Sequence, residues 1–229
     1  MKTYSIQMEV SGPTAMWTRP DTGDSPVSYP VPTWSAAKGI FEAIARIETV
    51  EIVPTKVEIC APIVYHSYAT NYGGPLREIE AFKKRNNYQL FATVLINVCY
   101  RLYGELRSIH GSRPLSAKAE KRRSIGCNAL HASLYASLHA SLHACQDIFN
   151  RRLEKGQFYD VPVLGWREFI PNYVGPFREQ TKVHEDINDT IQSFLFSVFD
   201  RNGAMSPVYT ADEINRKIIN GRLKYAERA

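Results

Sequence analysis

The most apolar stretch of this sequence constrains the fold more than any other feature. Residues 92–103 read ATVLINVCYRLY, a run rich in β-branched and aromatic residues. Such a run is typical of a central strand, buried inside a sheet. The chain has 229 residues, 44% of them hydrophobic, so it can bury a substantial core as one large domain or two small ones.

The stretches on both sides of this run predict further strands and helices. Before it we expect a strand at Tyr4–Val10 that stops at Ser11-Gly12-Pro13, a loop over 18–32, a helix over 33–44, strands at 50–53 and 56–63 separated by Pro54, and a polar-aromatic loop around Tyr65, His66, Tyr68 and Tyr72. After it we expect a helix over 128–155 ending at Gly156, a strand-like stretch over 161–169, short strands such as 193–200, and a weak helix over 211–220.

The order strand, helix, strand, strand, helix, strand predicts an α+β fold. We expect a ferredoxin-like (RRM-like) domain with an antiparallel sheet over residues 1–172, followed by a small, mainly β domain over residues 173–229. RNA-binding domains commonly use this scaffold, because its open sheet face and loops hold bases and phosphates. A metabolic enzyme or a regulatory module without nucleic acid would give the same outline, so the fold does not determine the function.

Charge and cysteine content narrow the class of protein. The net charge is +5, and basic residues cluster at Lys83-Lys84-Arg85, Lys121-Arg122-Arg123 and Arg151-Arg152, which permits an anionic partner but is also typical of solvated surface. The four cysteines are widely spaced, with no CxxC pair and no secretory leader, so we expect reduced thiols in a cytoplasmic protein. No apolar run approaches the ~20 residues that cross a bilayer, so we expect no membrane contact.

Residues 131–147, HASLYASLHASLHACQD, repeat almost every four positions. Four residues of an α-helix advance about 400°, so the repeated side chains form stripes that drift by about 40° per step. The stripe of interest consists of His131, Tyr135, His139 and His143. Leu and Ala fill the other stripes, which predicts an amphipathic helix with its Leu face on the sheet and its His/Tyr row toward solvent or RNA.

A metal site is the alternative interpretation of this repeat. His139, His143 and Asp147 have the spacing of zinc ligands on one helix face. A repeated tetrad produces that spacing automatically, however, and no Glu general base lies between the histidines. We therefore predict no metal and no other cofactor.

Three segments resemble a known family. Residues 16–44, MWTRPDTGDSPVSYPVPTWSAAKGIFEAI, are similar to a motif of the CRISPR-associated RAMP proteins, in the type I-C form of the fifth Cas family. The family pattern is F/W-T-x-P followed by S-Y-x-V-x-x-x-S-A-x-K/R-G-I-x-E-A-I, present here from Trp17 and from Ser28 onward. Residues 147–157, DIFNRRLEKGQ, and 162–169, PVLGWREF, agree as well.

The resemblance implies a subunit of the crRNA-guided surveillance complex Cascade. Such a subunit holds the 5′ handle of the crRNA, contacts the large and backbone subunits, and meets target DNA only indirectly. In type I-C systems it also cuts the repeat hairpin of the pre-crRNA without a metal: the ribose 2′-hydroxyl attacks the adjacent phosphate, and the enzyme transfers protons and stabilises the charged intermediate.

This sequence departs from the family's catalytic pattern. The family's processing subunits carry a Tyr in the first helix and a Lys-His pair at the start of the second, where this chain has Ala45 and Ala144-Cys145. Two hypotheses follow. The subunit binds RNA without cutting it, or it is an endoribonuclease in which His143 has taken over proton transfer.

Candidate RNA contacts come from loops and helix ends in these segments. A loop aromatic such as Trp17 can stack on a base, Arg19 can pair with a phosphate, and Lys38 lies near a helix N-terminus that favours anions. The full set is Trp17, Arg19, Lys38, Arg122, Arg123, Arg151, Arg152 and Arg167. The alternatives are that Trp17 is a core residue, that Lys38 is merely exposed, that Arg151 and Arg152 divide between RNA and solvent, and that Arg167 pairs with Glu168.

Overall fold

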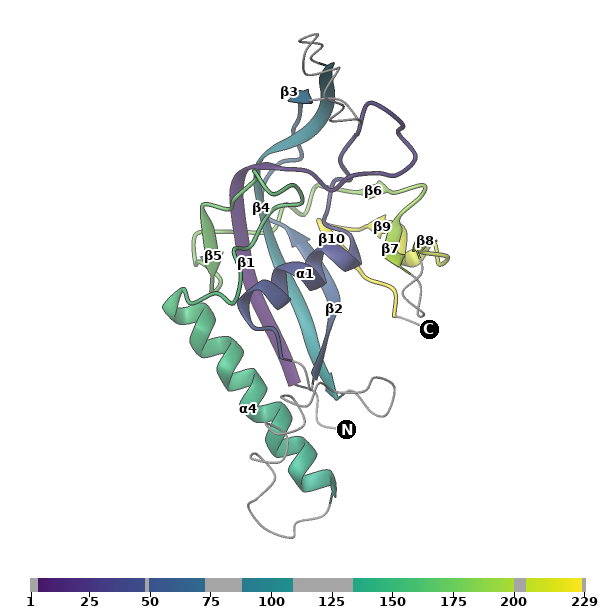
Figure 1. Cartoon of the computed structure of the whole chain (residues 1–229). Helices are drawn as coiled ribbons and strands as arrows, with labels where there is room; N and C mark the ends of the chain where they lie inside the picture. The colour runs from purple at the N-terminus through teal and green to yellow at the C-terminus, as the bar shows by residue number, and fades with distance from the viewer. Residues whose placement is uncertain (1–3, 48–49, 73–87, 109–133, 200–204, 228–229) are drawn as a thin grey trace, which may run out of the picture.

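Among the residues that the structure describes, the fold is a mainly antiparallel sheet with two helices, which confirms the predicted α+β class. The computed structural model describes residues 4–47, 50–72, 88–108, 134–199 and 205–227 (Figure 1). The main sheet contains β1 (Tyr4–Ala15), β2 (Val50–Ile59), β3 (Tyr65–Tyr72), β4 (Tyr88–Ser108), β5 (Tyr173–Gly175) and β10 (Arg222–Lys224). The helices are α1 (Trp34–Ile44) and α4 (Leu134–Lys155). Within the described residues, neither helix is long and apolar enough to cross a membrane.

The apolar run at 92–103 is the centre of the sheet, as predicted. It lies in β4, which pairs with β1 along one edge and with β2 and β3 along the other, so that the strand order is β10-β2-β4-β1-β5 with β3 beside β4. All of these pairings are antiparallel. Alternate residues of β4 such as Tyr100 and Leu102 are buried on the helix side, because the strand places successive side chains on opposite faces.

Helix α1 begins and packs as its sequence predicts. The Thr33 side chain caps the helix by accepting a hydrogen bond from the Ala36 backbone N–H at 3.2 Å. Its apolar face is buried, and the Phe41 ring contacts the Phe149 ring of α4 at 5.8 Å between centroids. Both helices therefore cover the same face of the sheet, and Figure 1 shows α1 crossing that face.

Several predicted boundaries were wrong. β1 continues through Gly12 and Pro13 to Ala15, because its pairing with β4 continues there. Pro54 does not separate two strands: β2 is continuous, with a bulge between Pro54 and Lys56 that accommodates the missing N–H. The expected loop at 65–72 is β3, paired with the first part of β4. The described part of the predicted helix at 128–155 is α4, and residues 128–133 lie outside the described residues.

The last third of the chain also differs from the prediction. Residues 161–169 form no strand. The weak helix at 211–220 is only a 3₁₀ turn, η1 (Ile214–Arg216), followed by β9 (Lys217–Ile218), which pairs with β6 (Asp189–Thr190). The predicted strand at 193–200 corresponds to β7 (Leu195–Phe199), which pairs with β8 (Met205–Tyr209).

The segment after residue 172 contributes strands to the main sheet. β5 pairs with β1 and β10 pairs with β2. The Tyr29 hydroxyl donates to the Ser193 carbonyl at 2.6 Å, and the Tyr225 hydroxyl donates to the Pro32 carbonyl at 2.8 Å. The division into domains at residue 172 stays a prediction.

Candidate functional site

A groove runs between α1 and the segment 159–165. Its volume is about 350 Å³. The backbone N–H groups of Tyr159 and Asp160 both donate to the Ala43 carbonyl, at 2.8 and 3.0 Å, which holds this segment over the last turns of the helix. The lining residues are Trp17, Ala36, Gly39, Ile40, Glu42, Ala43, Arg46, Tyr159, Asp160, Val161, Val163 and Gly165. Small residues of α1 thus leave room for a ligand, and charged and phenolic side chains surround it.

Gly165 ties this segment to the loop after β1. Its φ is +95°, and a Cβ at this position would collide with the Met16 carbonyl oxygen. The Met16 N–H donates to the Leu164 carbonyl at 2.9 Å, and the Leu164 N–H donates to the Phe169 carbonyl at 2.7 Å. Only glycine permits this approach. The sequence segments 16–44 and 162–169 therefore meet at one groove.

Three of the candidate RNA contacts near this groove are engaged within the protein. Trp17 is only 2% exposed and packs edge-on against Tyr100, so it is a core residue in this structure and offers little surface for a base. Arg19 makes two hydrogen bonds to the Asp21 carboxylate, at 3.1 and 2.8 Å. Lys38 pairs with Glu51 at 2.8 Å. These two cations would have to exchange or share a partner to bind phosphate.

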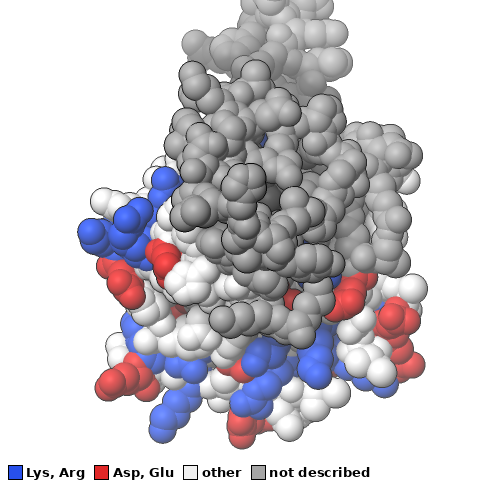
Figure 2. Space-filling model, turned by 90° about the horizontal axis from the view of Figure 1, so that it is seen from below, with Lys and Arg blue, Asp and Glu red and all other residues white. Residues whose placement is uncertain are grey.

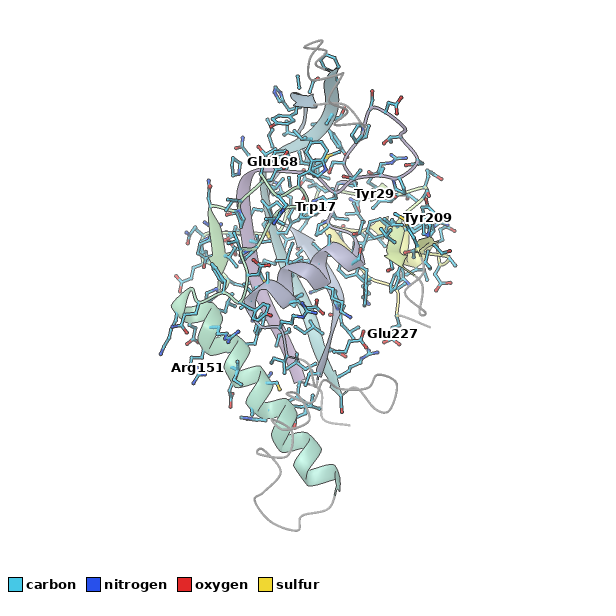
Figure 3. All side chains as sticks on the ribbon, in the orientation of Figure 1. Trp17, Tyr29, Arg151, Glu168, Tyr209 and Glu227 are labelled. Carbon is cyan, nitrogen blue, oxygen red and sulfur yellow. The ribbon has the colours of Figure 1, made fainter. Side chains whose placement is uncertain are left out.

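The arginines of α4 and of the 162–169 segment have different surroundings. Arg151 is exposed on the outer side of α4, far from Trp17 (Figure 3). Arg152 donates from Nη1 to the carbonyl of Ile44 at the end of α1, at 3.2 Å. Arg167 is exposed, and it makes no ion pair with Glu168 among the described residues. Arg122 and Arg123 lie outside the described residues.

His143 forms a side-chain pair on the surface of α4. Its Nδ1 lies 2.9 Å from an Asp147 carboxylate oxygen, and both side chains are more than half exposed. Ala144 beside it is exposed, whereas Ala45 and Cys145 are buried. No group of three or more His, Cys, Asp or Glu side chains is arranged to hold a metal within the described part of the chain.

The opposite face of the sheet carries a buried charge cluster that the sequence did not indicate. Glu9 is 0% exposed and accepts hydrogen bonds from the Arg178 side chain at 2.6 Å, from its backbone N–H at 3.1 Å, and from the Thr181 hydroxyl at 2.9 Å. Arg101 lies 3.4 Å from the same carboxylate and donates to the carbonyls of Arg178 and Thr181. Residues 177–181 therefore cover β1 and β4 where an open sheet face was expected.

The electrostatics of this cluster favour an ionised carboxylate. Burial raises the pKa of Glu9, but hydrogen bonds and charge from Arg178, together with the Thr181 hydroxyl, outweigh burial and lower it. A second buried carboxylate on this face, Glu58, has a pKa lowered in the same way by Lys56, Tyr103 and Arg222. These basic side chains are thus committed to internal carboxylates.

On the face that Figure 2 shows, the described charged side chains are of both signs. In Figure 2, Lys and Arg side chains are interspersed with Asp and Glu around the atoms drawn in grey. Arg46 is an exposed basic side chain that lines the groove, and Arg151 and Lys155 are exposed near the end of α4. Sequence reasoning missed Arg46 and Tyr159. Arg46 lies two residues after the end of the family motif, and this proximity was the only signal for it.

The comparisons with known proteins include a family match that contains the segment 16–44. A family described as CRISPR-associated protein (Cas_Cas5) matches residues 5–105. Two curated relatives are named CRISPR pre-crRNA endoribonuclease Cas5d, and both are 27% identical to this chain. The relative from Thermus thermophilus aligns over 75% of this chain and 63% of its own length, and that from Mannheimia succiniciproducens over 73% and 71%.

The fold has a counterpart among solved structures. A crystal structure described as a CRISPR-associated protein superposes with a TM-score of 0.63 at 18% identity, over 97% of this chain and 92% of that chain. The chain spans about 63% of the length of the first curated relative, so the match covers a part of that protein. This chain is therefore similar to Cas5 proteins over residues 5–105, to the curated Cas5d proteins over about three quarters of its length, and in fold to a CRISPR-associated protein.

Proposed function

We propose that this chain is the guide-RNA-binding subunit of a type I-C-like Cascade complex and holds the 5′ handle of the crRNA. The observation that carries the proposal is the groove between α1 and 159–165, because two of the three segments with the family pattern, 16–44 and 162–169, line it together. The names of the curated relatives, which act on pre-crRNA, support the same substrate class. The large and backbone subunits as partners, and target DNA as an indirect one, belong to this proposal.

The arrangement of the strands and helices also supports this function. We infer that β1, α1, β2, β4, α4 and β5 form a ferredoxin-like unit, because the order β2-β4-β1-β5 with antiparallel neighbours is the order of a split βαβ fold. Residues 177–181 occupy part of the sheet face that RRM domains use for bases. We therefore infer that RNA binds on the helix side, at the groove.

The chemistry of the groove suits an unpaired nucleotide. Gly39 has no atom within 4 Å of a Cβ position, so α1 leaves space there for a planar base. Arg46 supplies a guanidinium for phosphate, and Tyr159, 59% exposed, supplies an aromatic surface. The Arg152–Ile44 hydrogen bond joins the end of α4 to the end of α1, so Arg151 can extend the contact along the backbone.

Binding of a labelled repeat-hairpin RNA, followed by fluorescence anisotropy over a range of salt concentrations, tests this proposal. Gly39→Leu fills the groove and should weaken binding at least tenfold, because stacking of one base contributes about 1–3 kcal/mol. For Arg46→Glu, the plot of the logarithm of the binding constant against the logarithm of salt concentration should become less steep by about 0.7, the value for one single-strand phosphate contact. Lys182→Glu is the matched control, since Lys182 is exposed beside the residues that cover the other sheet face.

Two results would contradict the proposal. Equal affinities for the Gly39→Leu and Lys182→Glu variants would exclude the groove as the RNA site. Absence of salt-dependent binding by the unaltered protein would favour the alternative class, a ferredoxin-like enzyme or regulatory module unrelated to RNA.

The second candidate function is metal-independent cleavage of pre-crRNA. The His143–Asp147 pair favours it, since a carboxylate that orients an imidazole is a common general acid–base arrangement. Ala45 and Cys145 stand against it, because neither is the expected proton-transfer residue and both are buried. Repeat RNA incubated with the protein in EDTA separates binding from cleavage. If cutting occurs, His143→Ala should slow it at least tenfold, and an unchanged rate would remove His143 from the mechanism.

A further inference from the structure

We propose that Cys60 and Cys99 form a dithiol site that low-molecular-weight disulfides oxidise to an intramolecular disulfide, joining the end of β2 to β4. This site is independent of the groove and of RNA. The four cysteines are far apart in the sequence, so only strand pairing brings two of them together.

The strand register makes the two cysteines direct neighbours. Ile59 pairs with Tyr100, so the next antiparallel pair is Cys60 with Cys99, and the Cys60 N–H donates to the Cys99 carbonyl at 2.8 Å. Residues opposite each other in a hydrogen-bonded antiparallel pair have Cα atoms about 5.5 Å apart, and disulfides most often span about 5.5–6 Å. The backbone separation of this pair therefore matches the Cα separation of a disulfide.

The surroundings of Cys99 make it the attacking sulfur. The Arg178 guanidinium lies 3.8 Å from its Sγ, while the Glu9 carboxylate, also at 3.8 Å, favours the protonated thiol. Hydrogen bonding from Cys60 is the largest cause that lowers the pKa of the Cys99 thiol, and the charge of Arg178 adds to it against burial and Glu9. A cation next to a thiol promotes the reactive thiolate. The hydrogen bond with Cys99, and then burial, raise the pKa of Cys60, which suits the resolving thiol.

A shallow pocket borders one member of this pair, Cys99. Cys99 lines a hollow of about 270 Å³ together with Ser11, Gly12, Pro13, Asn97, Val98 and Asn172. Cys60 and Cys99 are both buried, at 8% and 7% exposed, so the exchange requires a small disulfide that approaches Cys99 from this hollow.

The oxidation is ordinary thiol–disulfide exchange. The Cys99 thiolate attacks one sulfur of RSSR and releases RS⁻, forming a mixed disulfide. Cys60 then loses its proton, attacks the Cys99 sulfur and releases the second RS⁻. Two protein thiols are oxidised by two electrons, and RSSR is reduced to two RSH after both thiolates take up a proton.

Oxidised glutathione tests the site on the full chain. The folded protein is incubated with it, remaining thiols are trapped by alkylation, and peptides are mapped by mass spectrometry. We expect a peptide pair joined through Cys60 and Cys99, whereas Cys145, equally buried in α4, should stay alkylatable. Cys60→Ser should accumulate glutathione on Cys99, and Cys99→Ser should react at least tenfold more slowly at Cys60. Circular dichroism confirms that each serine variant is folded.

Other outcomes overturn the proposal. Alkylation of both cysteines in the oxidised sample, glutathione retained on either cysteine of the unaltered protein, or a joined peptide pair only after denaturation would each exclude an accessible, resolving pair. The mapping of the unaltered protein needs no substitution, so it decides the question even if a serine variant fails to fold.

Discussion

Substitution of the buried Glu9 is the strongest test of how residues 177–181 are held to the sheet face that they cover. Glu9→Gln keeps the size of the side chain and removes its charge. The carboxylate accepts hydrogen bonds from Arg178 and Thr181 and faces Arg101, and it is itself 0% exposed. The substitution therefore leaves two guanidinium groups without their counter-charge.

The expected magnitude follows from this geometry. Removing one partner of a buried ion pair costs about 3–5 kcal/mol. The side chains of Arg178 and Arg101 are 31% and 18% exposed, so both can recover part of their hydration. We therefore expect the lower end of the range, a loss of about 3 kcal/mol in the free energy of unfolding.

Urea unfolding followed by circular dichroism measures this loss by linear extrapolation. Gln7→Ala is the matched control, because Gln7 is exposed on the same strand two residues away, and its loss should stay within about 0.5 kcal/mol. A loss below about 1 kcal/mol for Glu9→Gln, with an unchanged denaturant slope, would refute the view that this cluster anchors residues 177–181.

Two further predictions concern pH and backbone conformation. Because the pKa values of Glu9 and Glu58 are lowered in the folded state, these carboxylates stabilise the fold at pH values above the unfolded pKa of about 4.3. Stability should therefore fall as the pH decreases through and below that pKa. In thermal melts, the melting temperature of Glu9→Gln should fall less steeply with decreasing pH than that of the unaltered protein. An equally steep fall in the variant would exclude Glu9 as a contributor. Gly165→Ala should lower the free energy of unfolding in urea by about 3 kcal/mol or more, because φ is positive there and the new Cβ would collide with the Met16 carbonyl. Gly39→Ala, in an open helix interior, should raise it by about 0.5–1 kcal/mol. Similar effects of the two substitutions would contradict the role of Gly165.

The parts of the fold that sequence reasoning found are those with a complete local signal. Helix α1 has a Thr cap followed by buried residues at helical spacing, and β4 has a long apolar run. The strand at 65–72 was missed because its alternating polar and aromatic residues resemble a loop, and only pairing with the first part of β4 makes it a strand. The stretch 161–169 was misassigned because its apolar residues Leu164 and Phe169 are buried without strand pairing.

The candidate site divides in the same way. The segments 16–44 and 162–169 were recognisable from the sequence, but most single residues were not. Trp17 was a candidate for base stacking and is a core residue here, whereas Arg46 and Tyr159 line the groove without having been predicted. Side-chain burial depends on neighbours from distant segments, which a local pattern does not contain.

By itself, the sequence determines the α+β class, the central strand, the first helix and the segments that carry the family pattern, because capping, periodicity and apolar runs act over a few neighbouring residues. Only the tertiary structure decides which distant residues meet: α1 with 159–165 at the groove, Glu9 with Arg178 on the covered sheet face, and Cys60 with Cys99 across two strands. The physical reason is that strand register and chain crossings set these contacts, and both are settled by packing of the whole core.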